Sequence, residues 1–469
     1  MQHELDLRLE TDAIGEMKLS ASAVHGIQTE RARENFPITG VPLSHFPSLV
    51  NALAMVKWVA AETNAELDQI DTGKSDPIIK VCREITSGQH HAHFSVDMMQ
   101  GGAGTSTNMN ANEVIANLAL AKTGHPFGAY THLHPNDDVN LGQSTNDVYP
   151  TAVRLAILTQ IAPLCCALRH LQESFQERAG AFSDIPKVGR TQLQDAVPIS
   201  LGLEFQAFAD TIGEDVERLR QLGQLLMEVN LGGTAVGTGV NTHKDFGKLA
   251  VEKLAVISGF PLKQAHNLIE ASSDLGAFVT FSGVLKRVAV KLSKICNDLR
   301  LLSSGPRAGF GEIRLPAVQA GSSIMPGKVN PVIPEVVNQV CFQIIGNDLT
   351  VTMAAESGQL QLNAMEPVVV YNILESMRIL TNSINVLSDK CISGIEADTQ
   401  RCAELLDDSL VLATALAPRL GYDEAASIAK RALTEGKSIR RVVQETGCLT
   451  PHQLDEFLSA SNMISAKSN

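Results

Sequence analysis

The chain has 469 residues, of which 44% are hydrophobic, 19% charged and 4% aromatic, a composition typical of a globular protein of two or three domains with a sizeable core. With 38 basic and 51 acidic side chains, its formal net charge is −13, which argues against a protein that binds the phosphate backbone of nucleic acid. A small anionic substrate remains compatible with this charge, because a few converging donors set the field of a site.

The N-terminal segment, MQHELDLRLETD, is acidic and lacks the basic start and apolar run of a signal peptide. The sequence also has no uninterrupted apolar stretch of about 18 residues, which a membrane-spanning helix needs. We therefore expect a cytoplasmic protein with no membrane partner. The eight cysteines form no CxxC pair, so reduced and mostly buried thiols are predicted.

Residues 1–142 combine short helical segments, near 48–66 and 109–122, with turn-rich loops such as HPNDD at 134–138. This texture predicts an N-terminal domain over 1–142. From 397 onward, short amphipathic segments alternate with helix breakers, which predicts a small helical C-terminal domain over 397–469. No strong run of alternating strand residues is evident.

Between these flanks, residues 143–396 carry apolar stripes at helical spacing, which predict a central bundle of four or five long helices of about 20 residues each. Apolar stripes this regular must be buried against other helices, either of the same chain or of another subunit. We therefore expect a homo-oligomer. The stripes run over Ile157–Phe175, Phe205–Val229, Leu285–Leu302 and Val370–Cys391.

Polar segments rich in glycine, hydroxyls and carboxamides interrupt the helices, and such segments can donate hydrogen bonds to anions. They are QGGAGTSTNMNANE (100–113), GQSTNDVYP (142–150), GRTQLQD (189–195), LGGTAVGTG (231–239) and GSSIMPGKVNP (321–331). Their spacing fits neither a P-loop nor a GxGxxG fingerprint, so no nucleotide cofactor is predicted. The histidines at 90, 91 and 93 are more typical of a solvated loop than of a metal site, and no metal is predicted.

The segment GSSIMPGKVNP resembles the signature loop of the aspartase/fumarase superfamily, whose members eliminate a group across a succinyl Cα–Cβ bond to release fumarate. The resemblance covers nearly the whole chain, in order. It implies a mainly α fold of three domains, in which five long helices per chain form a twenty-helix core in a homotetramer. It also implies active sites shared by three subunits and no organic cofactor. The other similar segments are GGAGTSTNMNANEV, QSTNDVYPT, GRTQLQDAVP, KICNDLRLLSSGPRAG, NPVIPEVVNQVCFQIIGND and GQLQLNAMEP.

Within the superfamily, the sequence is more similar to the aspartase branch. GTSTNMN stands where fumarases usually show GTQSNMN, STND where they show SSND, and Gln192 where they usually carry histidine. The resemblance thus implies reversible β-elimination of ammonia from L-aspartate to give fumarate, and its partners would be L-aspartate, fumarate and ammonia. The alternatives are a class II fumarate hydratase, a succinyl lyase acting on an N-substituted aspartate, a non-catalytic protein that keeps the bundle, or a binding module without turnover.

The resemblance also implies roles for individual residues. Ser322 matches the general base, and Lys328 and Asn330 match the clamp on one substrate carboxylate. The other carboxylate becomes an aci-carboxylate as its charge grows, so it needs aimed donors. The residues matching these donors are Thr105, Ser144, Thr145 and Ser323, and those facing the ammonium group are Asn146, Thr191 and Gln192.

Gln192 cannot shuttle a proton as a histidine could, but an amine that leaves already protonated needs an acid less than a hydroxyl does. Glu335 has two equal explanations, a partner of residue 192 or an acidic residue stabilising a helix start. Asn112, Glu113 and Arg307 are interpreted as structural supports. The sequence departs from its relatives at Val24, His25, Asp138 and Leu141, and these departures bear on substrate preference.

Overall fold

The computed structural model describes residues 6–458. Within them the chain forms two compact units, each assembled from three stretches of sequence: unit 1 from 6–164, 218–287 and 343–379, and unit 2 from 165–217, 288–342 and 380–458. The prediction of three consecutive domains, 1–142, 143–396 and 397–469, stays a prediction, and its residues 1–5 and 459–469 lie outside the described part of the chain.

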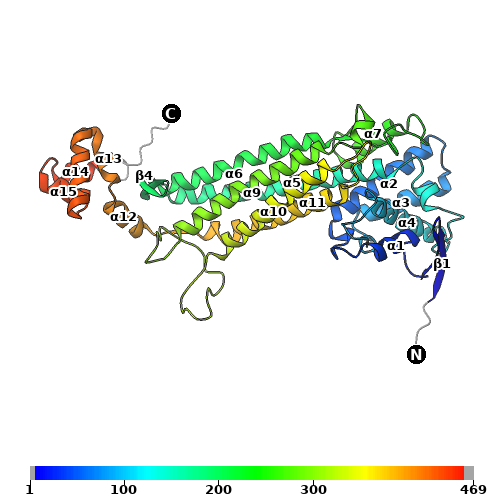
Figure 1. Ribbon diagram of the computed structural model, residues 1–469, viewed down its shortest axis with the longest axis horizontal. Coiled ribbons are helices and arrows are strands. Elements are labelled where there is room, and N and C mark those ends of the chain that lie inside the picture. The colour runs from blue at the N-terminus through cyan, green and yellow to red at the C-terminus, as the bar shows by residue number, and fades with distance from the viewer. Residues whose placement is uncertain (1–5, 459–469) are drawn as a thin grey trace. The chain divides into compact units, whose positions relative to one another are not determined.

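Five long helices form the framework, and each contributes residues to both units. The mainly α fold is therefore confirmed (Figure 1). The apolar stripes mark their buried faces, because Leu168, Leu171 and Phe175, for example, are fully buried. These helices are α5 (Thr145–Ala181), α6 (Leu201–Gly223), α9 (Gly276–Leu302), α10 (Val332–Glu356) and α11 (Glu366–Lys390).

Helix α5 has 37 residues, well beyond the predicted length. By length and composition it is the one helix of the described chain that could cross a membrane. However, 67% of its most apolar window is buried inside the protein. A buried core helix of a globular protein can be equally long and apolar, so length and composition alone do not indicate a membrane span.

The other helices of unit 1 are shorter, and most of them pack against one another. The two predicted short helices are present, and the one expected from 109 begins at Thr105. Gly104 precedes this first residue with a φ of +90°, and only glycine fits there, because a Cβ would lie 2.6 Å from the Tyr149 ring. The helices are α1 (Ile27–Asn35), α2 (Pro47–Glu66), α3 (Thr72–Thr86), α4 (Thr105–Lys122), α7 (Phe246–Ser258) and α8 (Leu268–Ala271). Single helical turns occur at Leu43–His45, His91–His93, Pro135–Val139 and Gln224–Leu226.

In unit 2, short helices follow residue 397, in keeping with the amphipathic pattern of the sequence. They enclose an apolar cluster that includes Leu416 and Val442, and Val188 from a strand far away in sequence also belongs to it. The helices are α12 (Thr399–Asp408), α13 (Val411–Leu420), α14 (Tyr422–Glu435), α15 (Ile439–Thr446) and α16 (Pro451–Phe457), preceded by a turn at Ile392–Gly394.

Within residues 6–458, four two-stranded sheets accompany the helices. The polar segment GRTQLQD forms the turn of the β3–β4 hairpin and parts of both its strands. The sheets pair β1 (Leu7–Asp12) with β2 (Gly15–Ser20), β3 (Pro186–Thr191) with β4 (Gln194–Ser200), β5 (Glu228–Val229) with β6 (Lys263–Gln264), and β7 (Ile313–Arg314) with β8 (Glu396–Ala397). The β5–β6 pair is parallel and the other three are antiparallel.

Candidate active site

The predicted site residues fall into two groups, one in each unit. In unit 1 they lie at the starts of α4 and α5, and in unit 2 they lie on the β3–β4 turn and on the loop between β7 and α10. Unit 1 holds Thr105, Ser144, Thr145 and Asn146, whereas unit 2 holds Thr191, Gln192, Ser322, Ser323, Lys328 and Asn330.

Asp147, which is fully buried, fixes the start of α5. One of its oxygens accepts the backbone N–H of Ser144 at 2.9 Å, and the other accepts those of Gly232 and Thr234, both at 3.0 Å. Burial raises the pKa of Asp147 to about 6, while these backbone donors and the nearby Lys57 act to lower it. Two backbone N–H groups of the LGGTAVGTG segment thus donate to Asp147 and are not available to a ligand.

The hydroxyl groups of Ser144 and Thr145 are both oriented as donors. Ser144 Oγ accepts the backbone N–H of Asn146 at 3.2 Å, and Thr145 Oγ1 accepts from Asn108 Nδ2 at 3.1 Å. An oxygen that accepts from the protein directs its own proton elsewhere. Both protons are therefore available to a carboxylate ligand.

A buried lysine is linked by hydrogen bonds to the Thr145 hydroxyl. Lys57 of α2 is fully buried and donates to Asn140 Oδ1 at 2.8 Å and to Gln143 Oε1 at 3.0 Å. Asn140 Oδ1 also accepts from Asn108 Nδ2 at 3.1 Å, so a continuous hydrogen-bonded path joins Lys57 to Thr145. Burial lowers the pKa of Lys57 to about 7, and the charge of Asp147 acts in the opposite direction. Sequence reasoning missed Lys57, because its partners lie more than 80 residues away.

Asn146 and Thr105 differ in what they can offer a ligand. Asn146 Nδ2 donates to Ala235 O at 2.8 Å, which leaves Oδ1 as an acceptor suited to an ammonium group. Thr105 is exposed, and its hydroxyl donates to Gly102 O at 2.7 Å. The donor role predicted for Thr105 therefore requires its side chain to rotate.

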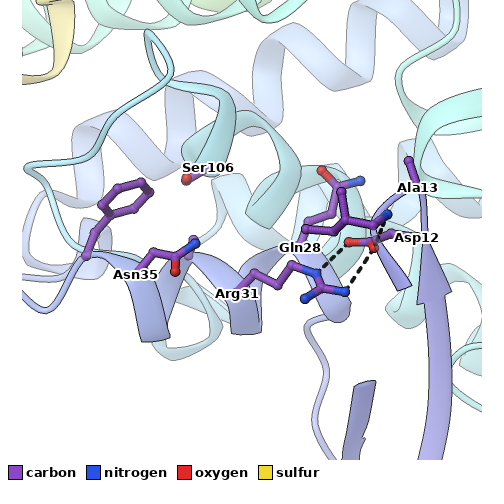
Figure 2. A pocket seen from close by; sticks show the side chains of 9 residues that line it. Asp12, Ala13, Gln28, Arg31, Asn35 and Ser106 are labelled. Carbon is purple, nitrogen blue, oxygen red and sulfur yellow. Dashed lines mark hydrogen bonds and ion pairs between the residues drawn. The ribbon is translucent and has the colours of Figure 1, made fainter. Parts of the chain in front are cut away.

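A cavity of about 320 Å³ lies next to Thr105 and is lined by Ser106, Arg31 and Asp12 among others. Figure 2 shows the Arg31 guanidinium facing the Asp12 carboxylate, with Nε–Oδ2 at 2.8 Å and Nη2–Oδ1 at 3.0 Å. This bidentate pair lowers the pKa of Asp12. Sequence reasoning missed the cavity, since nothing in the spacing of residues 12 and 31 indicates that they meet.

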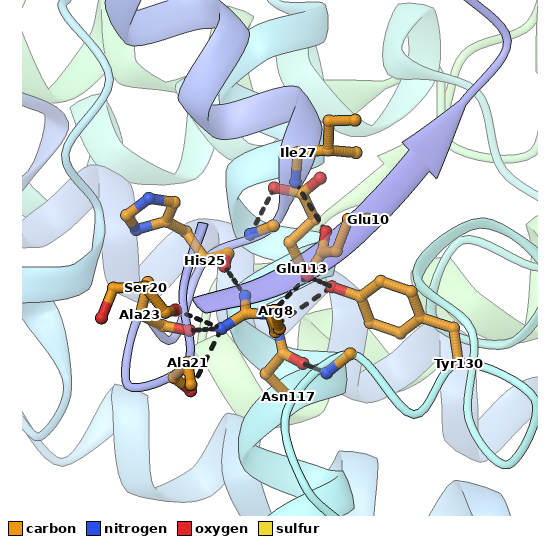
Figure 3. A network of polar contacts seen from close by, with 12 residues as sticks. Arg8, Glu10, Ser20, Ala21, Ala23, His25, Ile27, Glu113, Asn117 and Tyr130 are labelled. Carbon is orange, nitrogen blue, oxygen red and sulfur yellow. Dashed lines mark hydrogen bonds and ion pairs between the residues drawn. The ribbon is translucent and has the colours of Figure 1, made fainter. Parts of the chain in front are cut away.

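Helix α1, which carries Arg31, starts in a buried polar network (Figure 3). The Glu113 carboxylate accepts the backbone N–H groups of Gly26, Gln28 and Thr29 at 2.9, 2.8 and 3.0 Å. Burial raises the pKa of Glu113 to about 6, and these hydrogen bonds act to lower it. A carboxylate at a helix start also stabilises the helix dipole, and this geometry supports the interpretation of Glu113 as a structural residue.

The same network contains Arg8, whose guanidinium donates to the carbonyl oxygens of residues 20, 21, 23 and 25 and to Glu10 (Figure 3). Val24 is buried, and the His25 ring lies 2.7 Å from Glu30 Oε2. Burial lowers the pKa of His25, with Glu30 acting against it. Two of the residues that depart from relatives are thus part of a packed, hydrogen-bonded segment.

The other departures also have local partners. Asp138 is buried, forms an ion pair with Lys74 at 2.8 Å and accepts the His134 backbone N–H at 2.7 Å. The Leu141 carbonyl accepts from Asn64 Nδ2 at 2.8 Å. Glu335 lies exposed in the first turn of α10, where an acidic residue favours the helix start.

The loop that carries Ser322 closes on itself. The Gly321 backbone N–H donates to Lys328 O at 3.1 Å, and Asn330 Nδ2 donates to Gly321 O at 2.6 Å. Only glycine fits at this closure, because a Cβ on Gly321 would lie 2.3 Å from Lys328 O. One amide proton of Asn330 is thus used in this hydrogen bond within the loop.

Two backbone donors point at the Ser322 hydroxyl. Its Oγ accepts from the N–H groups of Ile324 at 3.2 Å and Met325 at 3.1 Å. Hydrogen bonds to an oxygen favour its anionic form, and these two donors act on Ser322 in that direction. Ser323 and Lys328 are exposed beside it, and the Lys328 ammonium supplies a positive charge on the same loop.

Within residues 6–458, no group of three or more His, Cys, Asp or Glu side chains is arranged to hold a metal ion. His90, from the histidine cluster, instead lies 3.2 Å from Glu84.

Comparisons with known proteins show the family of this chain. A family model described as lyase matches residues 15–346, and one described as fumarase C C-terminus matches 412–465. The aspartate ammonia-lyase of Pseudomonas aeruginosa is 56% identical over 461 residues, 98% of this chain and 97% of that protein.

Two solved structures are similar in fold. The crystal structure titled fumarate lyase:delta crystallin from Brucella melitensis bound to cobalt has a TM-score of 0.95 and 57% identity, covering 97% of this chain and 99% of the other. A class II fumarase from Schistosoma mansoni has a TM-score of 0.91 and 36% identity at the same coverage. The resemblance seen in the sequence motifs is confirmed, and this chain belongs to the lyase family that includes the aspartate ammonia-lyases and fumarases.

Proposed function

We propose that this protein is an aspartate ammonia-lyase, which reversibly eliminates ammonia from L-aspartate to give fumarate. One observation carries the proposal: the chain is 56% identical over nearly its full length to a protein named for that activity, but only 36% identical to a class II fumarase of the same fold. The carboxamide of Gln192 agrees with this preference, because an ammonium leaving group needs acceptors rather than a proton donor.

In this reaction the Ser322 alkoxide takes a proton from Cβ of aspartate, and the adjacent carboxylate becomes a doubly charged aci-carboxylate. The donor-oriented hydroxyls of Ser144 and Thr145 and the side chains of Ser323 and Thr105 bind that carboxylate, with Thr105 rotated from its present hydrogen bond. Such donors act where charge develops, which is the main requirement for catalysis here.

The Cα–N bond then breaks as the electron pair forms the Cα=Cβ bond, and the ammonium group leaves as ammonia. Asn146, Thr191 and Gln192 supply oxygen acceptors for that group. Lys328 and Asn330 hold the second carboxylate, for which a lysine ammonium is a suitable point charge. These steps use side chains and backbone of the chain and require no organic cofactor.

We further propose a homotetramer of three-domain chains, with active sites built from three subunits. Apolar residues along one face of α10 support assembly, because Phe342, Leu349 and Met353, which share a helix face at this spacing, are 61%, 61% and 63% exposed in the single chain. Exposed apolar residues gathered on one face typically mark a protein interface. A cytoplasmic location, as expected from the acidic N-terminal segment, completes the proposal.

A substrate panel tests the proposal. L-aspartate, L-malate and argininosuccinate are supplied in turn to the purified protein, and fumarate is followed by its ultraviolet absorbance. We expect turnover of L-aspartate alone. Turnover of malate alone would make the protein a fumarate hydratase, turnover of argininosuccinate alone would indicate a lyase for N-substituted aspartates, and fumarate binding without any turnover would indicate a non-catalytic protein.

A further inference from the structure

The turn of the β3–β4 hairpin, which follows Thr191, presents Gln192 in an unusual backbone conformation. Gln192 and Leu193 have φ values of +53° and +60°, the left-handed region that two-residue hairpin turns usually fill with Asn-Gly. Side chains larger than glycine are disfavoured there. The hairpin therefore holds Gln192 in a conformation that requires support from the rest of unit 2.

That support is a fully buried carboxylate at the base of the turn. Glu312 is 0% exposed, with Oε1 2.9 Å from Arg190 Nη1 and Oε2 3.0 Å from Lys187 Nζ. Arg190 directly precedes Thr191. In a regular strand, residues three apart point to opposite faces, but the register shifts at Gly189/Arg190. A bulge of this kind increases the local twist, and here both cations reach one carboxylate.

Glu312 is itself tied to the helices of unit 2. Its backbone N–H donates to Leu302 O at the end of α9, and its carbonyl accepts from the Asp398 N–H just before α12, both at 2.9 Å. Lys187 also pairs with Glu204 of α6 at 2.6 Å. The hairpin is thus held to α9 and to the start of α12 through Glu312, and to α6 through Glu204.

The charges within this group balance, since two cations face two carboxylates. Arg190 additionally lies over the Phe310 ring at 4.2 Å, which fixes the plane of its guanidinium. Removing one partner of a buried ion pair strongly destabilises a protein. The ion pairs of Glu312 therefore define the direction of the strand that leads into Thr191.

We propose that Glu312 is a positioning residue for the amine side of the active site: through Arg190 and Lys187 it sets the orientation of Thr191 and Gln192 toward the leaving ammonia. This inference rests on the proposed function. Glu312 touches no substrate and acts only through the hairpin. Loss of its charge should therefore affect the handling of ammonia and leave the binding of fumarate carboxylates nearly unchanged.

The test is Glu312→Gln in the full-length protein, assayed in the direction of ammonia addition to fumarate. Because a misplacement of about 1 Å can cost roughly 100-fold, we expect the KM for ammonia to rise about tenfold or more, while the KM for fumarate stays within about twofold. Amide hydrogen exchange of residues 186–200 should accelerate in the same variant, a readout that does not depend on activity.

Glu445→Gln is the matched control. Glu445 also lies between an arginine and a lysine, Arg431 at 3.0 Å and Lys437 at 2.8 Å, but on α15 and exposed to solvent. Its loss should change neither Michaelis constant. If Glu312→Gln does not fold, Arg190→Lys keeps the charge but loses the planar fork, and it should give the same selective rise in the KM for ammonia.

Equal rises in the two Michaelis constants, or a folded variant with unchanged kinetics and hydrogen exchange, would overturn the inference. Wild-type protein that does not convert L-aspartate at all would instead overturn the proposed function. The two failures are therefore distinguishable, and in the second case the exchange of residues 186–200 still reports whether Glu312 holds the hairpin.

Discussion

Asn108 Nδ2 lies 3.1 Å from Thr145 Oγ1, and this one hydrogen bond orients the hydroxyl at the start of α5. The same amide nitrogen donates to Asn140 Oδ1 at 3.1 Å, which in turn accepts from the buried Lys57. A neutral carboxamide on α4 thus orients a threonine hydroxyl as a donor and connects it to a buried lysine.

Replacing Asn108 tests this orientation. In Asn108→Asp the new carboxylate accepts from Thr145, so the hydroxyl proton is withdrawn from the substrate. We expect kcat for L-aspartate to fall by about 100- to 1,000-fold, as for loss of one oxyanion donor. Asn108→Leu has a similar size and merely frees the hydroxyl, so its loss should be smaller. Steady-state fumarate production measures both variants, and a greater loss in Asn108→Leu would contradict the assigned direction of the bond.

The closed form of the 315–331 loop gives a second prediction. Gly321→Ala places a Cβ 2.3 Å from Lys328 O, so the closure fails and no longer fixes the adjacent turn in which two backbone N–H groups donate to Ser322. A general base typically contributes about 100- to 10,000-fold, and kcat should fall within that range while the thermal midpoint changes little. Gly180→Ala is the control, since a Cβ there meets nothing within 4 Å. Full activity of Gly321→Ala would show that the closure is not needed.

The pH dependence of stability follows from Glu366 at the start of α11. Burial raises the pKa of Glu366 from 4.5 to about 8, and Arg154 acts to lower it. The folded protein therefore keeps a proton that the unfolded chain releases above pH 4.5. The stabilising contribution is complete below pH 4.5 and is lost as the pH rises through 8.

Glu366→Gln removes this titration. Between pH 4.5 and 8, the unfolding free energy of the wild type should fall relative to the variant by a few kcal/mol, on the order of 1.4 kcal/mol per unit of pKa difference. Urea unfolding at several pH values measures the difference. Glu113 and Asp147 also have raised pKa values, both about 6. Because both proteins contain them, their contributions cancel in the difference between the two unfolding free energies. Parallel curves for the two proteins would contradict the assignment.

The sequence predicts some parts of the molecule well, for a physical reason. A helix that buries one face must repeat apolar residues every three or four positions, which is why Leu168 and Phe175 could be assigned to a core. The β3–β4 hairpin carries no such signal. Its strands contain Pro186 and Pro198, and its Gln-Leu turn lacks the usual Asn-Gly.

Supporting residues of the site are equally hidden in the sequence. Lys57 stands in the apolar run ALAMVKWVA, and only the fold brings Asn140 and Gln143 to it. Motif resemblance locates residues that contact substrate, because chemistry restricts their type. It does not locate the carboxylates and amides that orient them, since many residue pairs far apart in sequence can satisfy the same hydrogen bonds.

Sharing of active sites between subunits gives the last prediction. Ser322→Ala lies in unit 2 and Thr145→Val in unit 1, and each variant alone should be nearly inactive. If the two groups of site residues come from different chains, unfolding and refolding the variants together should form mixed tetramers in which roughly one site in four has both wild-type residues. Activity of the mixture should then reach about a quarter of the wild-type value, whereas simple mixing of folded variants should give none.

Disrupting the exposed face of α10 provides the companion measurement. Phe342→Glu and Leu349→Glu together place two charges on residues that are each 61% exposed in the single chain, so the isolated chain tolerates them but an apolar interface does not. Light scattering should report a molar mass below that of the wild type, and turnover of L-aspartate should fall with it, because a chain without neighbours lacks one group of site residues. A monomeric double variant with full activity would contradict shared sites, since each chain would then complete its own.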